Sequence, residues 1–167
     1  MGKYPMLSLA GTPVDSENEV QRITGTGVIS GGTWDLSVLG NPVDDIPWDA
    51  TAAGLAILVD NPEVAITGGP VATVPFEFEY VGVQGGLDVD PLTADDTNLT
   101  GAGATLTVTS PHAGVSGSFR GVGPGTRVQD IDAGLIYENT GTTHTPVWTA
   151  APADVTRTWT LTEHDNT

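Results

Sequence analysis

The stretch VPFEFEYVG (74–82) decides the fold class, because large apolar side chains alternate in it with charged ones. Phe76, Phe78 and Tyr80 fall on one side of an extended chain, and two glutamates fall on the other. This alternation is typical of a strand in an antiparallel sheet that has one buried and one solvated face. The stretch therefore predicts a sheet that covers a core on one side only.

The same period of two recurs in other segments of the chain. TWDLSVL (33–39) and ATLTVTS (104–110) alternate apolar with polar residues, and EVQRITGTGVI (19–29) and VAIT (64–67) are expected as further strands. The 22 Gly and 12 Pro residues supply the turns that many short strands need. The chain is thus expected to be mainly β, with an antiparallel β-sandwich-like domain over residues 17–112.

One short α-helix is expected near residues 50–59, within the sequence DATAAGLAILVDNP. Asp49 is the predicted N-cap, and Asn61–Pro62 is the predicted stop. The apolar stripe of this helix is widened by Ile57 and Leu58. A helix that is apolar on most sides is expected to be covered on most sides.

The two ends of the chain differ from this domain. Residues 1–16 show no clear periodicity and are predicted to form an extended arm, which can add a strand to the sheet edge of a neighbour. Residues 113–127 are rich in Gly and Ser and are predicted to form a hinge. Residues 128–167 are predicted to form a small C-terminal β-module, because the strand candidates RVQDID (127–132), GLIYEN, PVWTA and RTWTLTE follow the hinge. The expected partner-binding residues of the arm are Tyr4, Met6, Leu7 and Leu9.

The charge balance restricts the partners, because 21 acidic residues face five basic ones and the net charge is −16. Such a surface repels the phosphates of nucleic acids and of anionic lipids, so binding to either is not expected. No apolar run is long enough for a membrane span or a signal peptide. The absence of cysteine excludes disulfides and thiolate metal sites. Two interpretations of the charge stay open: it keeps an exposed protein soluble, or it docks the protein on a basic partner.

The residue types that carry catalysis are sparse. His112, His144 and His164 lie far apart, without the spacing of metal ligands. The sequence GVSGS around Ser116 misses the G-x-S-x-G pattern of a nucleophile elbow by one place and lacks its strand-to-helix context. The Gly-rich runs lead into strands and not into helices whose first turn binds phosphate. An enzyme and a cofactor are therefore not expected.

A cluster of acidic residues is a candidate for a metal or catalytic site. Asp88, Asp90, Asp95 and Asp96 lie in a segment, 84–103, that is expected as a loop. Oxygen-rich loops bind calcium, but this spacing has no EF-hand register, so a solvated acidic loop is favoured and no metal site is predicted. No pair of carboxylates stands out as a glycosidase pair.

The Trp residues have different expected roles. Trp34 and Trp159 are expected in the core, and Trp48 is expected to staple the turn that precedes the helix. Trp148 offers a flat apolar face that can stack on a carbohydrate. A host-surface glycan-binding module is therefore one alternative, with Trp148 or Trp48 as the platform.

Six segments, in order over residues 18–101, resemble the motifs of a β-domain that is common in virion proteins of tailed phages infecting actinobacteria. They are Asn18–Gln21, Gly32–Val38, Ile46–Ala53, Val64–Gly69, Leu92–Ala94 and Leu99–Gly101. The stretch GLIYENTGTTHTPVWTA (134–150) is similar to a hairpin that is frequent near the C-termini of phage head-decoration and fibre proteins. Two features depart from the family: the helix is shorter and more apolar, and the loop around Asp44 is more acidic.

The resemblance implies a virion structural protein. We expect a capsid decoration protein on the outer surface of the phage head, where many copies bind the major capsid protein and stabilise the shell. Association with copies of itself is also expected, and a trimer suits the three-fold positions of an icosahedral shell. The alternative is a minor tail or tail-tip protein, with or without glycan binding, because the same domain occurs in head and tail proteins.

Overall fold

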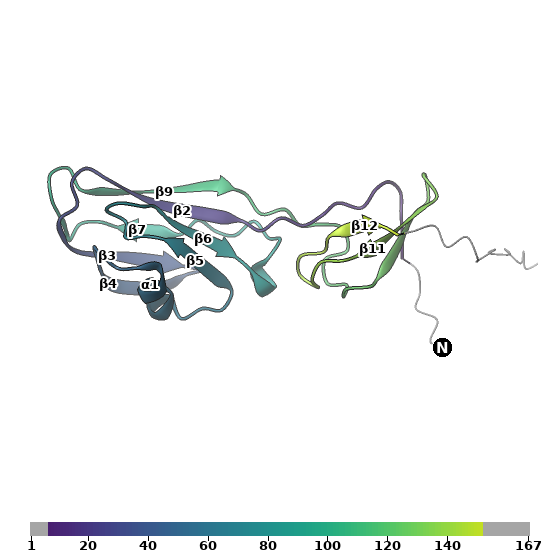
Figure 1. Ribbon diagram of the computed structural model, residues 1–167, viewed down its shortest axis with the longest axis horizontal. Coiled ribbons are helices and arrows are strands. Elements are labelled where there is room, and N and C mark those ends of the chain that lie inside the picture. The colour runs from purple at the N-terminus through teal and green to yellow at the C-terminus, as the bar shows by residue number, and fades with distance from the viewer. Residues whose placement is uncertain (1–6, 152–167) are drawn as a thin grey trace, which may run out of the picture.

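The computed structural model describes residues 7–151, which form two β units placed end to end (Figure 1). We call residues 18–112 the main domain. The smaller unit, which we call the C-terminal module, combines residues 7–14 with residues 118–151. The molecule is therefore elongated, with the start and the end of its described chain in the same unit.

The main domain is a β-sandwich with antiparallel strand pairing, so the predicted fold class is confirmed. One sheet has the strand order β5 (Val64–Gly68), β6 (Phe76–Tyr80), β2 (Val20–Thr26) and β9 (Thr105–His112). The other has the order β4 (Asn41–Pro47), β3 (Gly31–Val38) and β7 (Thr93–Asp95), with the short β8 (Leu99–Thr100) also paired to β3. A 3-10 turn, η1 (Gly82–Gln84), follows β6.

The core lies between the two sheets and is built from the alternating side chains. The apolar residues of β3 are at most 2% exposed, and Phe76, Phe78 and Tyr80 of β6 are fully buried. The ring of Trp34 lies 6.0 Å from that of Phe76, so the two layers meet through aromatic contacts. The alternation read from the sequence is confirmed in both strands, and Trp34 lies in the core as expected.

A buried polar network ties the segment after η1 to the first sheet. The Glu19 carboxylate is 2% exposed and accepts hydrogen bonds from Gln21 Nε2 (2.6 Å) and from the Val89 amide (2.6 Å). Gln21 Oε1 accepts from the Leu92 amide (2.7 Å) and from the Tyr80 hydroxyl (3.3 Å). Burial, and after it the charge of Glu19, raises the pKa of Tyr80 to about 12. The network satisfies buried polar groups that would otherwise destabilise the sandwich.

Strands occur in two places where the sequence predicts loops. β4 contains Asp44, Asp45 and two prolines, which are typical of a turn, but it is an edge strand paired only to β3. At an edge, the missing amide of proline removes no ladder hydrogen bond on the free side. The segment 84–103 contains β7 and β8, whose short pairings with β3 are too brief for a periodic signal.

The helix expected near 50–59 is α1 (Ala52–Val59). Its N-cap is Thr51 and not the predicted Asp49, because Thr51 Oγ1 accepts a hydrogen bond from the Gly54 amide (3.2 Å). Asp60 ends the helix in the left-handed conformation (φ 44°, ψ 45°), one residue before the predicted Asn61–Pro62 stop. The helix connects β4 to β5 and thus passes from one sheet to the other (Figure 1).

The C-terminal module is built on a second four-stranded sheet. Its order is β1 (Leu7–Leu9), β10 (Arg127–Asp130), β11 (Leu135–Asn139) and β12 (Trp148–Ala150). β1 is parallel to β10, and the other pairs are antiparallel. Val128 is fully buried, and Trp148, which is 7% exposed, meets the ring of Phe119 edge to face at 6.1 Å. RVQDID, GLIYEN and PVWTA thus contain strands as predicted, whereas RTWTLTE and Trp159 lie outside the described residues.

The stretch 134–150 forms the hairpin of β11 and β12, and a buried Asn holds its loop. Asn139 is 1% exposed, and its Oδ1 accepts the amides of Gly141 (2.9 Å) and Val147 (3.1 Å). Its Nδ2 donates to the Val122 carbonyl oxygen (3.0 Å). The turn residues of this stretch therefore shape the hairpin.

The structure differs from the hinge predicted over residues 113–127. Most of this segment belongs to the C-terminal module, where Phe119 contributes to the core. Arg120 reaches back to the main domain, where its Nε donates to the Gly85 carbonyl oxygen (3.1 Å) and its Nη2 donates to that of Val83. Because a guanidinium can satisfy two carbonyl oxygens at once, Arg120 links the C-terminal module to the main domain through two hydrogen bonds.

Candidate functional site

The outward side of α1 is an exposed apolar surface. Leu55 is buried, but Ile57 is 77% and Leu58 47% exposed, and Ala53 and Ala56 are exposed as well. We call these four exposed residues the α1 face. The expectation that the helix is covered on most sides is wrong, because α1 packs mainly against β5 and less against β4, and four of its eight residues are exposed.

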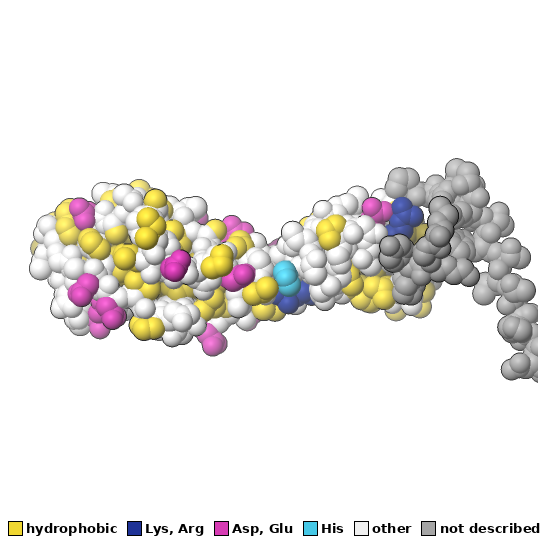
Figure 2. Space-filling model, turned by 90° about the horizontal axis from the view of Figure 1, so that it is seen from below, with side chains coloured by type: hydrophobic (Ala, Val, Ile, Leu, Met, Phe, Trp, Pro, Cys, Tyr) yellow, Lys and Arg dark blue, Asp and Glu magenta, His cyan; other side chains and the backbone are white. Residues whose placement is uncertain are grey.

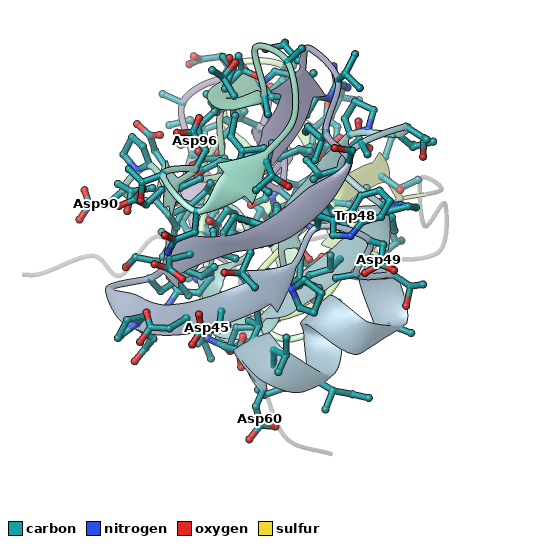
Figure 3. All side chains as sticks on the ribbon, turned by 90° about the vertical axis from the view of Figure 1, so that its left-hand side faces the viewer. Asp45, Trp48, Asp49, Asp60, Asp90 and Asp96 are labelled. Carbon is teal, nitrogen blue, oxygen red and sulfur yellow. The ribbon has the colours of Figure 1, made fainter. Side chains whose placement is uncertain are left out.

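Acidic side chains surround this apolar surface. Asp49 precedes the helix, Asp60 ends it, and Asp45 lies on the neighbouring β4; all three are exposed. Figure 3, which faces the end of the main domain remote from the C-terminal module, shows these three aspartates around α1. The same view shows Asp90 and Asp96 on the opposite flank of the sandwich.

Basic groups are almost absent from the main domain. Its sequence has thirteen acidic residues and one base, Arg22, whose Nε lies 3.1 Å from Glu77 Oε1. Figure 2 shows the side of the molecule on which α1 lies, with hydrophobic side chains spread among acidic ones over the main domain. On that side, Lys and Arg side chains are visible only near the junction and on the C-terminal module.

The residues predicted for the arm fall in two classes. Tyr4 and Met6 lie outside the described residues. Leu7 and Leu9 are half-buried in β1, where they pair with Val128 and Asp130 of the same chain. The structure thus places these two leucines in the sheet of the C-terminal module, and their binding to a neighbour stays a prediction.

The predicted acidic loop serves the fold. Asp95 Oδ1 accepts a hydrogen bond from the Thr97 amide (2.9 Å), and the hydrogen bonds of Thr97 hold the pKa of Asp95 below its usual value. Asp96 Oδ2 accepts from the Leu106 amide (2.6 Å), which joins this segment to β9. Within residues 7–151, no group of three or more His, Asp or Glu is arranged to hold a metal ion.

An open groove of about 460 Å³ lies at the junction of the two units. Near it, Glu17 and Val115 form an antiparallel bridge, and Glu17 Oε2 lies 3.8 Å from His112 Nδ1. Asn18 Nδ2 donates to Glu79 Oε1 (2.8 Å), which also lines the groove. These exposed polar groups provide neither an activated nucleophile nor an enclosed space for a ligand.

The glycan platform suggested for Trp148 is not accessible, because that ring is 7% exposed and its Nε1 donates to the Ser118 carbonyl oxygen (3.1 Å). Trp48 is half-buried against the core, next to α1 (Figure 3). His112 and His144 lie near the junction groove, and His164 lies outside the described residues. No helix of the described residues is long and apolar enough to cross a membrane.

The sequence contains a signal for the α1 face, namely apolar residues on more than one side of the helix, but in the sequence alone this signal predicts a helix covered on most sides. Ile57 and Leu58 fall outside the stripe of residues that faces the sandwich. A helix of eight residues that packs on the edge of a sandwich buries only that one stripe, so the other apolar side chains stay exposed.

Comparison of the chain with protein-family models found no match, and comparison with curated proteins found no significant match.

Proposed function

We propose that this protein is a structural component of a tailed-phage virion and decorates the outer surface of the head by binding the major capsid protein. The observation that carries the proposal is the α1 face, an apolar surface left uncovered on a strongly acidic domain. Contiguous apolar surface on a soluble protein marks a site of association with a macromolecule. The proposal assigns the chain a binding role and no catalysis.

The resemblance to phage virion proteins supports the proposal, because the resembling segments coincide with structural elements of the main domain. Its six segments supply β3, β5 and β8 and the starts of β2, α1 and β7. Gly32 and Gly101 in these segments have positive φ angles, and a Cβ at either would collide with a carbonyl oxygen, of Asn98 and Val28 respectively. The resembling residues therefore maintain this sandwich and its turns.

The elongated shape also supports a decorating role. α1 lies on a long side of the main domain, and the C-terminal module extends beyond one end of that domain (Figure 1). A protein attached through α1 would therefore lie along the surface that it covers, and its length would increase the area that each copy covers. Self-association on the shell, with a trimer at three-fold positions, belongs to the same proposal.

Immunogold labelling of intact virions with an antibody against this chain tests the location. We expect gold over the whole head, together with hundreds of copies per virion by quantitative mass spectrometry. Gold confined to the tail, with a handful of copies, would reject decoration and favour the minor tail or tail-tip alternative. Labelling of a phage that lacks the gene serves as the control.

A further inference from the structure

We propose that the α1 face is the docking surface of this protein, and that its partner is a protein with an apolar groove rimmed by Lys or Arg side chains. This inference rests on the proposed function only in taking a virion protein as the partner. The shape of the helix and the charge around it indicate this kind of partner.

The helix has the form that a groove accepts. Ile57 and Leu58 project large apolar side chains, while Ala53 and Ala56 keep the adjoining helix surface low, so a partner can approach the backbone closely. An exposed helix that presents apolar anchors is recognised by insertion into a hydrophobic groove. Such anchors contribute most when water is fully excluded around them.

The charges exclude a second copy as the occupant of this surface. Two α1 faces in contact would bring Asp45, Asp49 and Asp60 of both copies together. The sole base of the main domain, Arg22, is already paired with Glu77 and cannot neutralise them. Nucleic acids and anionic lipids are repelled for the same reason.

The same charges select a basic partner. Lys or Arg side chains at the rim of the partner's groove would face carboxylates on three sides of α1. Such complementary charges speed association and fix the register of the complex. Asp45 (φ 56°) and Asp60 (φ 44°) both have left-handed backbones, which Asn also adopts readily. The charges can therefore be removed by D45N and D60N without straining the backbone.

Co-sedimentation with purified particles tests the docking surface. The probes are heads and tails isolated separately from a phage that lacks this gene. We expect the double variant I57A/L58A to bind its particle about ten- to a hundred-fold more weakly, because two apolar anchors are truncated. L135A is the matched control: Leu135 is 49% and Leu58 47% exposed, but Leu135 lies in the C-terminal module. Ala favours helices, so the double variant is expected to keep the fold, which circular dichroism verifies.

The charge variants supply a second readout. D45N/D60N is expected to bind more weakly at low salt and to lose part of the salt dependence of the native chain, because fewer charge pairs form with the rim. An unchanged salt dependence would overturn the basic rim of the proposed groove.

The outcomes separate this inference from the proposed function. If the native chain binds heads and I57A/L58A binds them equally well, the docking surface is wrong and decoration stands. If the native chain binds tails alone and I57A/L58A loses that binding, the docking surface stands and decoration is wrong. Binding of the native chain to neither particle would overturn both.

Discussion

The buried Tyr80 predicts a loss of stability at alkaline pH. Its hydroxyl is fully buried, and burial together with the Glu19 charge raises its pKa from 10.0 to about 12. An unfolded chain releases this proton near pH 10, whereas the folded chain retains it. The contribution of Tyr80 is therefore fully present below pH 10 and is lost as the pH rises from 10 to 12.

The magnitude follows from the size of the pKa shift. One pKa unit corresponds to about 1.4 kcal/mol, so the free energy of unfolding falls by roughly 3 kcal/mol across this window. Y80F removes the titrating group and with it this fall. At neutral pH the same change loses the hydrogen bond to Gln21 Oε1, which costs about 1 kcal/mol, while the Leu92 amide still donates to that oxygen.

The assay is urea unfolding of the native chain and Y80F, followed by far-ultraviolet circular dichroism between pH 8 and pH 12. Few other groups titrate in this range, because four of the five basic residues are Arg. Y137F is the matched control, since Tyr137 lies in β11 of the other unit. An equal decline in Y80F and in the native chain would refute the assignment to Tyr80.

Three further changes test the helix, the module and the junction. G54A is expected to raise the free energy of unfolding by about 0.5–1 kcal/mol, because a Cβ there meets only Thr51 Oγ1 at an ordinary 3.5 Å; a lower melting temperature would contradict this. W148A is expected to cost about 3–5 kcal/mol and to lower amide-exchange protection in the C-terminal module, with the main domain still protected. R120A is expected to loosen the junction, which would broaden the interdomain angles seen by small-angle scattering; unchanged scattering would show that Arg120 does not fix the orientation.

Much of the main domain could be predicted from the sequence, because its long strands are buried on one face. A period of two is visible only when a strand has several residues on each side, as in β3 and β6. β4 escaped prediction because an edge strand tolerates the prolines and aspartates that usually indicate a turn. The N-cap was assigned to Asp49 because Asp and Thr are both good caps, and only the chain path decides which side chain meets a free amide.

Contacts between distant parts of the chain could not be predicted in this way. β1 pairs with β10 across most of the chain length, and nothing in the sequence around Leu7 and Leu9 identifies that partner. The Gly-rich segment suggested flexibility, yet Arg120 binds carbonyl oxygens of the main domain. Local composition indicates how flexible an isolated backbone segment is, but it does not show which tertiary hydrogen bonds restrict that segment in the folded chain.

The two interpretations of the acidic charge describe one physical effect. An apolar surface that contains Ile57 at 77% exposure promotes association of copies with one another. Thirteen carboxylates in the main domain oppose that association, because every copy carries the same sign around α1. The repulsion disappears only against a surface of opposite charge, so under the proposed docking the same acids would oppose self-association and would direct α1 to a basic partner. A variant that keeps the α1 face but carries Asn at positions 45, 49 and 60 is therefore expected to self-associate at lower concentration than the native chain, and analytical ultracentrifugation measures this. If the variant stays as monodisperse as the native chain, charge is not what protects the exposed helix.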